Sequence, residues 1–328
     1  MSRVVSRLLP VAVLLALVAG IRYLVGALHQ EFLLTPLTMS GYSALAALGL
    51  CLFMGYAGQV SLGHAAFVAI GGYTSAVMCT VAHLAPWIGT LAGLAAAGVA
   101  AVIVGLPSLR LRGHYLAMAT LSFGIIVGRI VVATRIFGQA DGIYNVPPLQ
   151  LVAGLAVSGK RALRAQNYWL AWGIVAVGLL LARNLAASRA GRALKAIRGD
   201  EDAASALGVN VGRHKLAAFV ASALFGALAG SLLTHYSGGI GPSDVSIMKS
   251  IRWVALVAAG GMGSAGGVLA VTTVLTFLSL RGVFGFYDDA VFAAILLAIM
   301  LFAPEGIFTG ARSLVRRRRR ARAGGAAA

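Results

Sequence analysis

The chain has 328 residues, of which 59% are hydrophobic and only 11% are charged, and its mean hydropathy is +0.89. A soluble globular domain carries about 25% charged residues, so this composition excludes one and is typical of a polytopic integral membrane protein. The formal net charge of +18 then points either to membrane orientation or to an acidic partner.

Apolar runs long enough to cross a membrane recur along the whole chain. They cover residues 8–28, 32–54, 65–82, 87–106, 115–134, 167–182, 215–235, 253–280 and 286–303. A spanning helix needs about 20 apolar residues, so each run predicts a helix, and the long run 253–280, which carries a glycine break, predicts two. We therefore predict an all-α fold of about 8–10 transmembrane helices with broken helices, and about ten in the preferred count. An even number places both termini on one side.

The first apolar run follows Arg3 and Arg7, which is also the pattern of a cleaved signal peptide. No A-x-A-like cleavage site follows it clearly. Because the chain goes on to span the membrane repeatedly, an uncleaved first helix needs no extra assumption.

Residues 55–72 (GYAGQVSLGHAAFVAIGG) place polar side chains among glycines between two apolar runs. Such a segment can break a helix and turn polar backbone toward a cavity, and a second glycine-rich break follows at 260–267. Two discontinuous helices predict a substrate path near the middle of the bilayer. An alternative of equal weight is that the polar side chains form interhelical hydrogen bonds. The candidate pathway residues are Tyr56, Gly58, Gln59, Ser61 and His64.

The sequence contains two isolated patterns that resemble nucleotide-binding motifs. Residues 154–161 (GLAVSGKR) match the first seven positions of a phosphate-binding loop, but Arg161 stands where a Ser or Thr must bind magnesium. Residues 261–266 (GMGSAG) match G-x-G-x-x-G, with Asp288 at a suitable distance for a ribose contact. Neither has the flanking strands and helices of a nucleotide-binding fold. We interpret them as chance similarity and as a helix break, and expect no ATPase activity, metal or cofactor in this chain.

The nine acidic residues all fall in predicted loops or at the ends of predicted spans. An ion-coupled carrier usually places a carboxylate at mid-membrane, where the ion must be paired. The chain therefore lacks an energy source of its own, and is either a passive pore or one subunit of a machine that is powered elsewhere.

Residues 192–209 form the one long polar interruption of this apolar sequence, within a wider polar segment over 189–213, and we predict that they form two short helices exposed to water. Four basic residues recur three apart, and therefore lie close to one helical face: Arg189, Arg192, Lys195 and Arg198. An acidic triplet then precedes a run of small residues that ends at Gly208; the triplet is Asp200, Glu201 and Asp202. This element is typical of a docking site for a cytoplasmic partner.

The distribution of positive charge predicts the orientation. Of the 27 Lys and Arg residues, 18 fall in loops on one face of the preferred arrangement: in 3–7, 110–112, 183–215 and 312–322. The positive-inside rule assigns that face, and with it both termini, to the cytoplasm. We predict a transmembrane domain over 1–311 and a disordered basic cytoplasmic tail over 312–328. The tail favours anionic lipid over nucleic acid.

Four blocks carry a resemblance that covers about residues 35–308: GYAGQVSLGHAAFVAIGGYTSAV (55–77), LPSLRLRGHYLAMATLSFG (106–124), GRALKAIRGDEDAASALGVNVGRHKLAAFVASA (191–223) and LVAAGGMGSAGGVLA (256–270). With these blocks the chain resembles the inner-membrane permeases of branched-chain amino acid ABC transporters. The similarity is to the M-type permease rather than to its shorter H-type companion.

The resemblance implies an importer permease in a bacterial inner membrane. Its implied partners are a homologous H-type permease, two cytoplasmic ATP-binding subunits and an extracytoplasmic substrate-binding protein. The run from Glu201 to Gly208 resembles the acid-Ala-Ala-x-x-x-Gly coupling motif of ABC importers. With the basic face, the implied ATPase-coupling residues are Arg192, Lys195, Arg198, Glu201, Asp202, Ala203, Ala204 and Gly208.

The chain departs from this family at two places. The external loop 137–149 (FGQADGIYNVPPL) lacks a TGGxxGL-like stretch that relatives often carry, and Glu305 stands where relatives commonly have a basic residue. Similar permeases import urea or short-chain amides instead of hydrophobic amino acids. A passive channel or carrier for a small neutral solute, with 189–209 as an anchor for a partner, is a further alternative.

Overall fold

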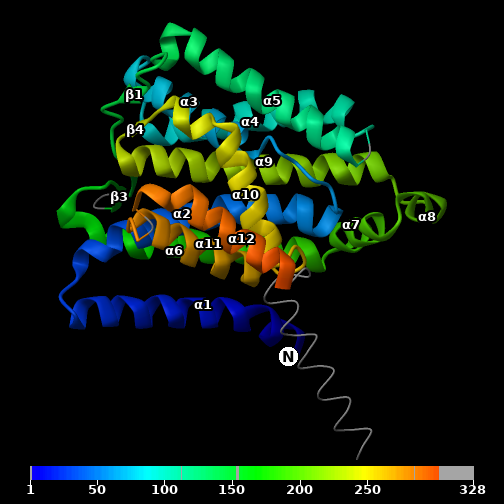
Figure 1. Ribbon diagram of the computed structural model, residues 1–328, viewed down its shortest axis with the longest axis horizontal. Coiled ribbons are helices and arrows are strands. Elements are labelled where there is room, and N and C mark those ends of the chain that lie inside the picture. Colours follow the sequence, from blue (N-terminus) through cyan, green and yellow to red (C-terminus); the bar gives the residue numbers. More distant parts are fainter. Residues whose placement is uncertain (1, 112, 153–154, 284, 303–328) are drawn as a thin grey trace, which may run out of the picture.

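The computed structural model describes residues 2–111, 113–152, 155–283 and 285–302 (Figure 1). Its α-helices are α1 (Ser2–Ala27), α2 (Leu34–Cys51), α3 (His64–Thr80), α4 (Pro86–Ser108), α5 (His114–Ala133), α6 (Arg164–Ala187), α7 (Arg189–Gly199), α8 (Glu201–Ala206), α9 (Val211–Ser237), α10 (Ile247–Gly260), α11 (Ala265–Leu280) and α12 (Asp288–Phe302). Two short antiparallel pairs accompany them: β1 (Ile143–Tyr144) with β4 (Gly239–Ile240), and β2 (Leu149–Val152) with β3 (Leu155–Val157). The predicted all-α class is confirmed.

Each predicted apolar run contains a helix. Within the described residues, six helical stretches are long and apolar enough to cross a membrane: Leu9–Ala27, Glu31–Tyr56, Pro86–Ser108, His114–Ala133, Arg161–Ala187 and Val211–Ser237. The chain is therefore a polytopic membrane protein. Helices α3, α10, α11 and α12 are shorter, and ten crossings stay a prediction.

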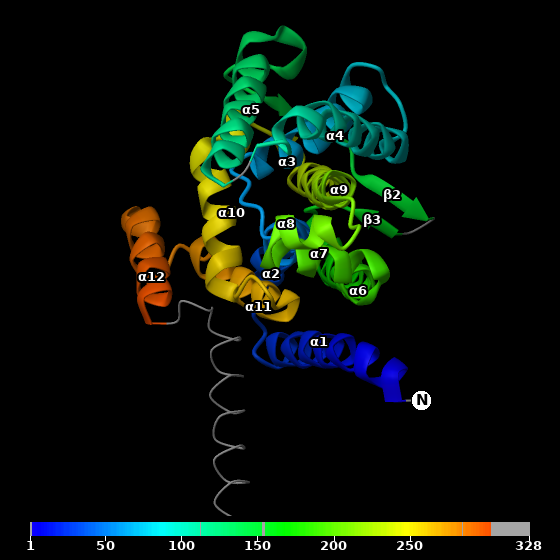
Figure 2. The same cartoon turned by 90° about the vertical axis from the view of Figure 1, so that its right-hand side faces the viewer.

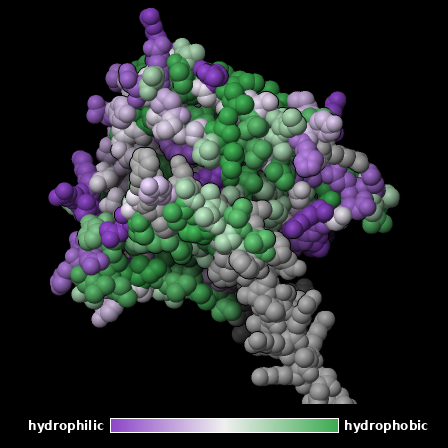
Figure 3. Space-filling view, viewed as in Figure 1, coloured by the Kyte–Doolittle hydropathy of each residue, from purple (hydrophilic) through white to green (hydrophobic). Residues whose placement is uncertain are grey.

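Helices α1, α2, α6 and α9 run along the long axis of the molecule, which is horizontal in Figure 1. Helix α10 runs across this direction in both views (Figures 1 and 2). In the apolar stretch of α2 89% of residues are buried, against 17% in that of α1, so α2 is central and α1 peripheral. On the face shown in Figure 3, hydrophobic residues fill the middle and hydrophilic residues gather toward the left-hand and right-hand ends. This banding suits a membrane that encloses the middle.

Glycines allow α3 to pack tightly between α4 and α9. A Cβ atom at Gly230 of α9 would lie 1.9 Å from the carbonyl oxygen of Val68, and one at Gly93 of α4 would lie 2.6 Å from that of Gly71. Gly226 and Gly230, like Gly89 and Gly93, are four residues apart and share a helix face. This small-xxx-small spacing lets membrane helices approach closely, which gains van der Waals contact.

Both predicted helix breaks are present. After α2 the chain makes one turn of π-helix (Leu52–Tyr56), then runs irregularly to His64, where α3 begins. The second break separates α10 from α11 at 261–264 and carries Gly261 at φ +92°. The breaks touch each other, because a Cβ atom at Gly55 would lie 1.8 Å from the carbonyl oxygen of Met262.

The predicted pair of short polar helices is confirmed as α7 and α8, which project at the right of Figure 1. Ser188 caps α7, because its Oγ accepts from the Gly191 N–H at 3.2 Å, and Asp200 caps α8 by accepting from the Asp202 and Ala203 N–H groups at 2.9 Å. Helix α7 buries Leu194 and Ile197 and exposes its basic residues.

The phosphate-loop-like segment 154–161 leads through β3 into a 3₁₀ turn, with residues 153–154 outside the described residues. The loop 137–149 contributes β1, which joins it to β4 beyond α9. The predicted basic tail 312–328 and Glu305 also lie outside the described residues.

Candidate functional site

Two parts of the chain that the sequence singled out lie against each other: the first helix break (52–63) and the predicted coupling segment (189–213). Arg198 of α7 donates from its guanidinium to the carbonyl oxygen of Gly55. Gly58 has φ +70°, and a Cβ atom there would lie 2.8 Å from Cγ of Arg198, so only glycine fits this place without a shift. The Lys195 Nζ lies 5.7 Å from the centre of the Tyr56 ring, which is cation–π range.

A buried polar network fixes α8 to the same break. The Gln59 side-chain amide donates to Oε1 of Glu201 at 2.9 Å and to the Ala57 carbonyl oxygen at 3.3 Å. The same Oε1 of Glu201 forms an ion pair with Nζ of Lys215, near the beginning of α9. The Lys215 side chain is 2% exposed and that of Glu201 19% exposed. Glu201 therefore joins the coupling segment, the break and a spanning helix at one point.

Most residues of the coupling segment are exposed. Leu207, at the end of α8, is 84% exposed, although it is a large apolar residue. Ala204 packs inward and is buried. The remaining predicted coupling residues are exposed: Arg192, Lys195, Arg198, Asp202, Ala203 and Gly208. A projecting leucine within a charged rim has the composition of a docking surface, since apolar side chains in the centre and charges at the edge are usual in protein interfaces.

Ser61 and His64 lie deeper in the bundle. Ser61 is 2% exposed, and His64, the first residue of α3, is 1% exposed. The His64 Nε2 lies 2.9 Å from the Ala46 carbonyl oxygen of α2, and its ring packs edge-on to Trp253 of α10 with centroids 6.2 Å apart. His64 thus connects α2, α3 and α10. These contacts are those expected if the polar residues of the break form interhelical hydrogen bonds.

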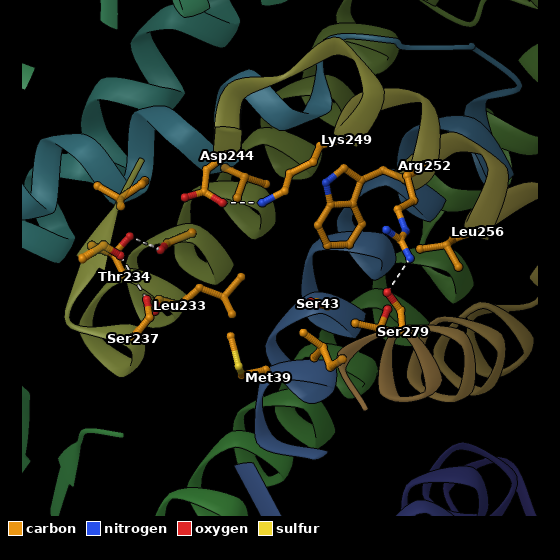
Figure 4. Close-up of a pocket in the computed structure, with 17 residues that line it drawn as sticks. Met39, Ser43, Leu233, Thr234, Ser237, Asp244, Lys249, Arg252, Leu256 and Ser279 are labelled. Atoms are coloured by element: carbon orange, nitrogen blue, oxygen red, sulfur yellow. Dashed lines mark hydrogen bonds and ion pairs between the residues drawn. The ribbon is translucent and has the colours of Figure 1, made fainter. Parts of the chain in front are cut away.

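A cavity of ≈ 240 Å³ lies between α2, α3, α9, α10 and α11 (Figure 4). It lies at the far end of α9 from α7 and α8, because Leu233, Thr234 and Ser237 line it from the last turns of α9, and α7 and α8 precede the beginning of that helix. Its wall is apolar at Met39, Val68, Leu233 and Leu256, among others, and Asp244, Lys249 and Arg252 bring charge to it. None of the five predicted pathway residues lines this cavity. Trp253 connects the two regions, because it lines the cavity and packs on His64.

Sequence reasoning missed Lys215 and the charged residues of the cavity. A lysine four residues inside an apolar helix was one available signal, because such a charge needs a partner. Lys249 and Arg252 offered another, since residues three apart on a helix share a face. The described acidic residues do lie in loops or near element ends, as predicted.

The family of branched-chain amino acid transport system permease components matches residues 32–304 of the chain. The permease protein LivM of the high-affinity branched-chain amino acid transport system of Salmonella typhimurium is 33% identical over 294 residues, which cover 82% of this chain and 68% of LivM. LivH of Escherichia coli, from the same kind of system, is 26% identical over 298 residues, or 85% of this chain and 94% of LivH. The L-arabinose transport system permease protein AraH of Escherichia coli is 27% identical over 270 residues, covering 79% of this chain and 78% of AraH. No solved structure matches the chain.

Proposed function

Because this chain belongs to the family of branched-chain amino acid transport permeases, we propose that it is the transmembrane permease subunit of an ABC importer for branched-chain, hydrophobic amino acids. The observation that carries this proposal is the 33% identity to LivM over 82% of the chain. The expected resemblance to an M-type permease is confirmed, since the chain is 33% identical to LivM and only 26% identical to LivH. Amino acid permeases are thus favoured over the urea, amide and passive-channel alternatives.

The chain would work with separate subunits. An H-type permease would complete the membrane part, two ATP-binding subunits would dock on α7 and α8, and a substrate-binding protein would deliver the amino acid at the opposite end. In this arrangement the face that carries α7 and α8 and both termini are cytoplasmic, as the positive-inside rule predicts. The exposed Leu207 and its charged rim support α8 as the part that enters a groove of the ATPase.

The coupling path would run through the contacts of Glu201 and Arg198. When the ATPases close, α7 and α8 move, and Gln59, Gly55 and Lys215 are the groups through which that motion reaches the spans. Tyr56 and Gly58 would act as the surface on which α7 rests, and Ser61 and His64 as the continuation of the break toward the cavity. A broken helix is suited to this role, because its irregular backbone can change conformation at little cost to the packed helices.

One experiment tests the whole assembly. The tagged full chain is purified from its native membrane in mild detergent and the co-purifying proteins are identified by mass spectrometry. A second permease and ATP-binding proteins are expected, and ATP-dependent uptake of leucine by the reconstituted complex should follow. Reproducible recovery of the chain alone, or uptake that persists after ATP depletion, would support a passive carrier instead.

Charge reversal tests the coupling surface. Arg192→Glu with Lys195→Glu should abolish coupled uptake and leave the protein in the membrane, because both side chains are exposed. Glu201 is kept in this variant, since a lysine there would face the buried ammonium of Lys215 and destabilise the fold. Arg110, exposed just after α4 and outside α7 and α8, gives a matched control as Arg110→Glu. Full uptake and ATPase stimulation in the double variant would refute the coupling role.

A further inference from the structure

Asp244 and Lys249 bring opposite charges to one edge of the cavity, and Arg252 brings a third charge to it beside Leu256 and Ser279 (Figure 4). Asp244, in the 3₁₀ turn before α10, forms an ion pair with Lys249, and Figure 4 shows the two side chains meeting at the cavity edge. The pair is accessible, since the Lys249 and Asp244 side chains are 46% and 36% exposed. Asp244 is held in place by its second oxygen, Oδ2, which accepts from the Gly241 N–H at 3.0 Å.

One stripe of α10 supplies both kinds of wall. Lys249, Arg252, Trp253 and Leu256 follow one another at helical spacings of three and four, so they share one face, and all four line the cavity. The stripe passes from an ammonium group at the beginning of α10 to the buried Leu256, which is 2% exposed. Met39 and Leu233 continue the apolar wall from α2 and α9.

The Arg252 guanidinium is anchored, unlike the ion pair at the edge. It donates to Ser279 Oγ at 2.8 Å and to Asp288 Oδ2 at 3.3 Å, and it stacks on Phe292 with 3.9 Å between its Cζ and the ring centre. Ser279 donates to the same Asp288 oxygen at 2.7 Å. Asp288 therefore balances the charge of Arg252, and the pair of Asp244 and Lys249 is the part of the site whose contact a ligand can replace.

We propose that this cavity binds the zwitterion of an aliphatic α-amino acid, with its carboxylate on Lys249, its ammonium group on Asp244 and its side chain against Trp253, Leu256 and Met39. The inference rests on the proposed function and deepens it by assigning the substrate contacts within the permease. A zwitterion can enter between the two charges and pair with both. A sugar or an amide separates them without replacing either charge, which costs free energy.

The charges of the ligand can be tested one at a time. The complete importer is solubilised without its binding protein, and radiolabelled leucine is displaced by isocaproate, which is leucine without the ammonium group, and by isoamylamine, which is leucine without the carboxylate. Unlabelled leucine should compete at least about tenfold better than either, because a charge-assisted hydrogen bond is lost in each analogue. Equal competition by an analogue, or by L-arabinose, would overturn the proposal.

Two variants make the test reciprocal. Asp244→Asn should weaken leucine binding about tenfold or more but should not weaken isocaproate binding, because it removes the carboxylate that competes with isocaproate for Lys249. Lys249→Gln should likewise weaken leucine binding but not isoamylamine binding. The amide introduced by Asp244→Asn carries no charge, but its oxygen can still accept from the Gly241 N–H, so the turn is preserved. Glu31→Gln, which breaks the pair of Arg22 and Glu31 at 3.8 Å, is the matched control and should change the binding of none of the three ligands. A merely structural ion pair would weaken all three ligands alike, which would overturn the proposal.

Transport assays separate this inference from the proposed function. In liposomes with the binding protein, both variants should lose leucine uptake about tenfold or more and keep the ATPase stimulation by loaded binding protein. Lost stimulation would overturn the inference and make Asp244 and Lys249 docking residues for the binding protein. Wild-type complex that imports no branched-chain amino acid would refute the proposed function. Wild-type import with unchanged import by both variants would refute the inference alone.

Discussion

The single variants Glu201→Gln and Lys215→Met should each destabilise the chain, but by unequal amounts. The Lys215 side chain is 2% exposed, so Glu201→Gln leaves an ammonium group buried without its carboxylate, which costs about 3–5 kcal/mol. The Glu201 side chain is 19% exposed and accepts from Gln59 at 2.9 Å, so Lys215→Met leaves a carboxylate that keeps water and one strong donor. We expect about 1.5–3 kcal/mol for that change.

The double variant Glu201→Gln/Lys215→Met should be more stable than the sum of the single effects predicts, by at least about 1 kcal/mol, because neither charge is left behind. Thermal unfolding of the purified chain in detergent, followed by size-exclusion chromatography of what remains folded, ranks the variants. Glu31→Gln, which breaks the more exposed pair with Arg22, is the control and should cost less than about 1 kcal/mol. Additive effects, or a larger cost for Lys215→Met than for Glu201→Gln, would contradict the buried pair.

Three further changes test the packing and the docking surface. Gly230→Ala should lower the free energy of unfolding by at least about 1–3 kcal/mol, because the new Cβ would overlap the α3 backbone. Gly173→Ala is the control, since a Cβ there meets nothing within 4 Å. The yield of folded protein in detergent compares the two variants. Gly58→Ala should reduce coupled ATPase activity more than Gly282→Ala, because both residues have positive φ but only Gly58 also meets Arg198. Equal losses would assign the effect to backbone strain. Leu207→Asp should release the ATP-binding subunits on purification without changing the melting temperature, and unchanged recovery would exclude Leu207 from the interface.

Composition and local spacing were enough to predict the elements. Long apolar runs predicted the spanning helices, since each must bury about 20 residues in lipid. Glycines beside polar residues predicted the breaks at 52–63 and 261–264, and the polar run 192–209 predicted the two short helices α7 and α8. These features depend on neighbours within a few turns of the chain, which a sequence displays directly.

The sequence also predicted which residues matter, but not how they are joined. Tyr56, Gly58 and Gln59 were predicted for a substrate path, and in the tertiary structure they contact α7 and α8 and do not line the cavity. Whether they also contact substrate stays a prediction. Gln59 and Glu201 are 142 positions apart, and no periodicity relates them.

By itself, the sequence determined a polytopic helical membrane protein of a known permease family, with two helix breaks and one polar segment that forms two short helices. Only the tertiary structure decided that the breaks touch, that Lys215 is buried against Glu201, and that Asp244 and Lys249 edge a cavity. The physical reason is that helix formation is local, whereas the meeting of two side chains depends on how whole helices pack. Here that packing is set by glycine surfaces such as Gly93 and Gly230, where the backbones of distant segments come into contact.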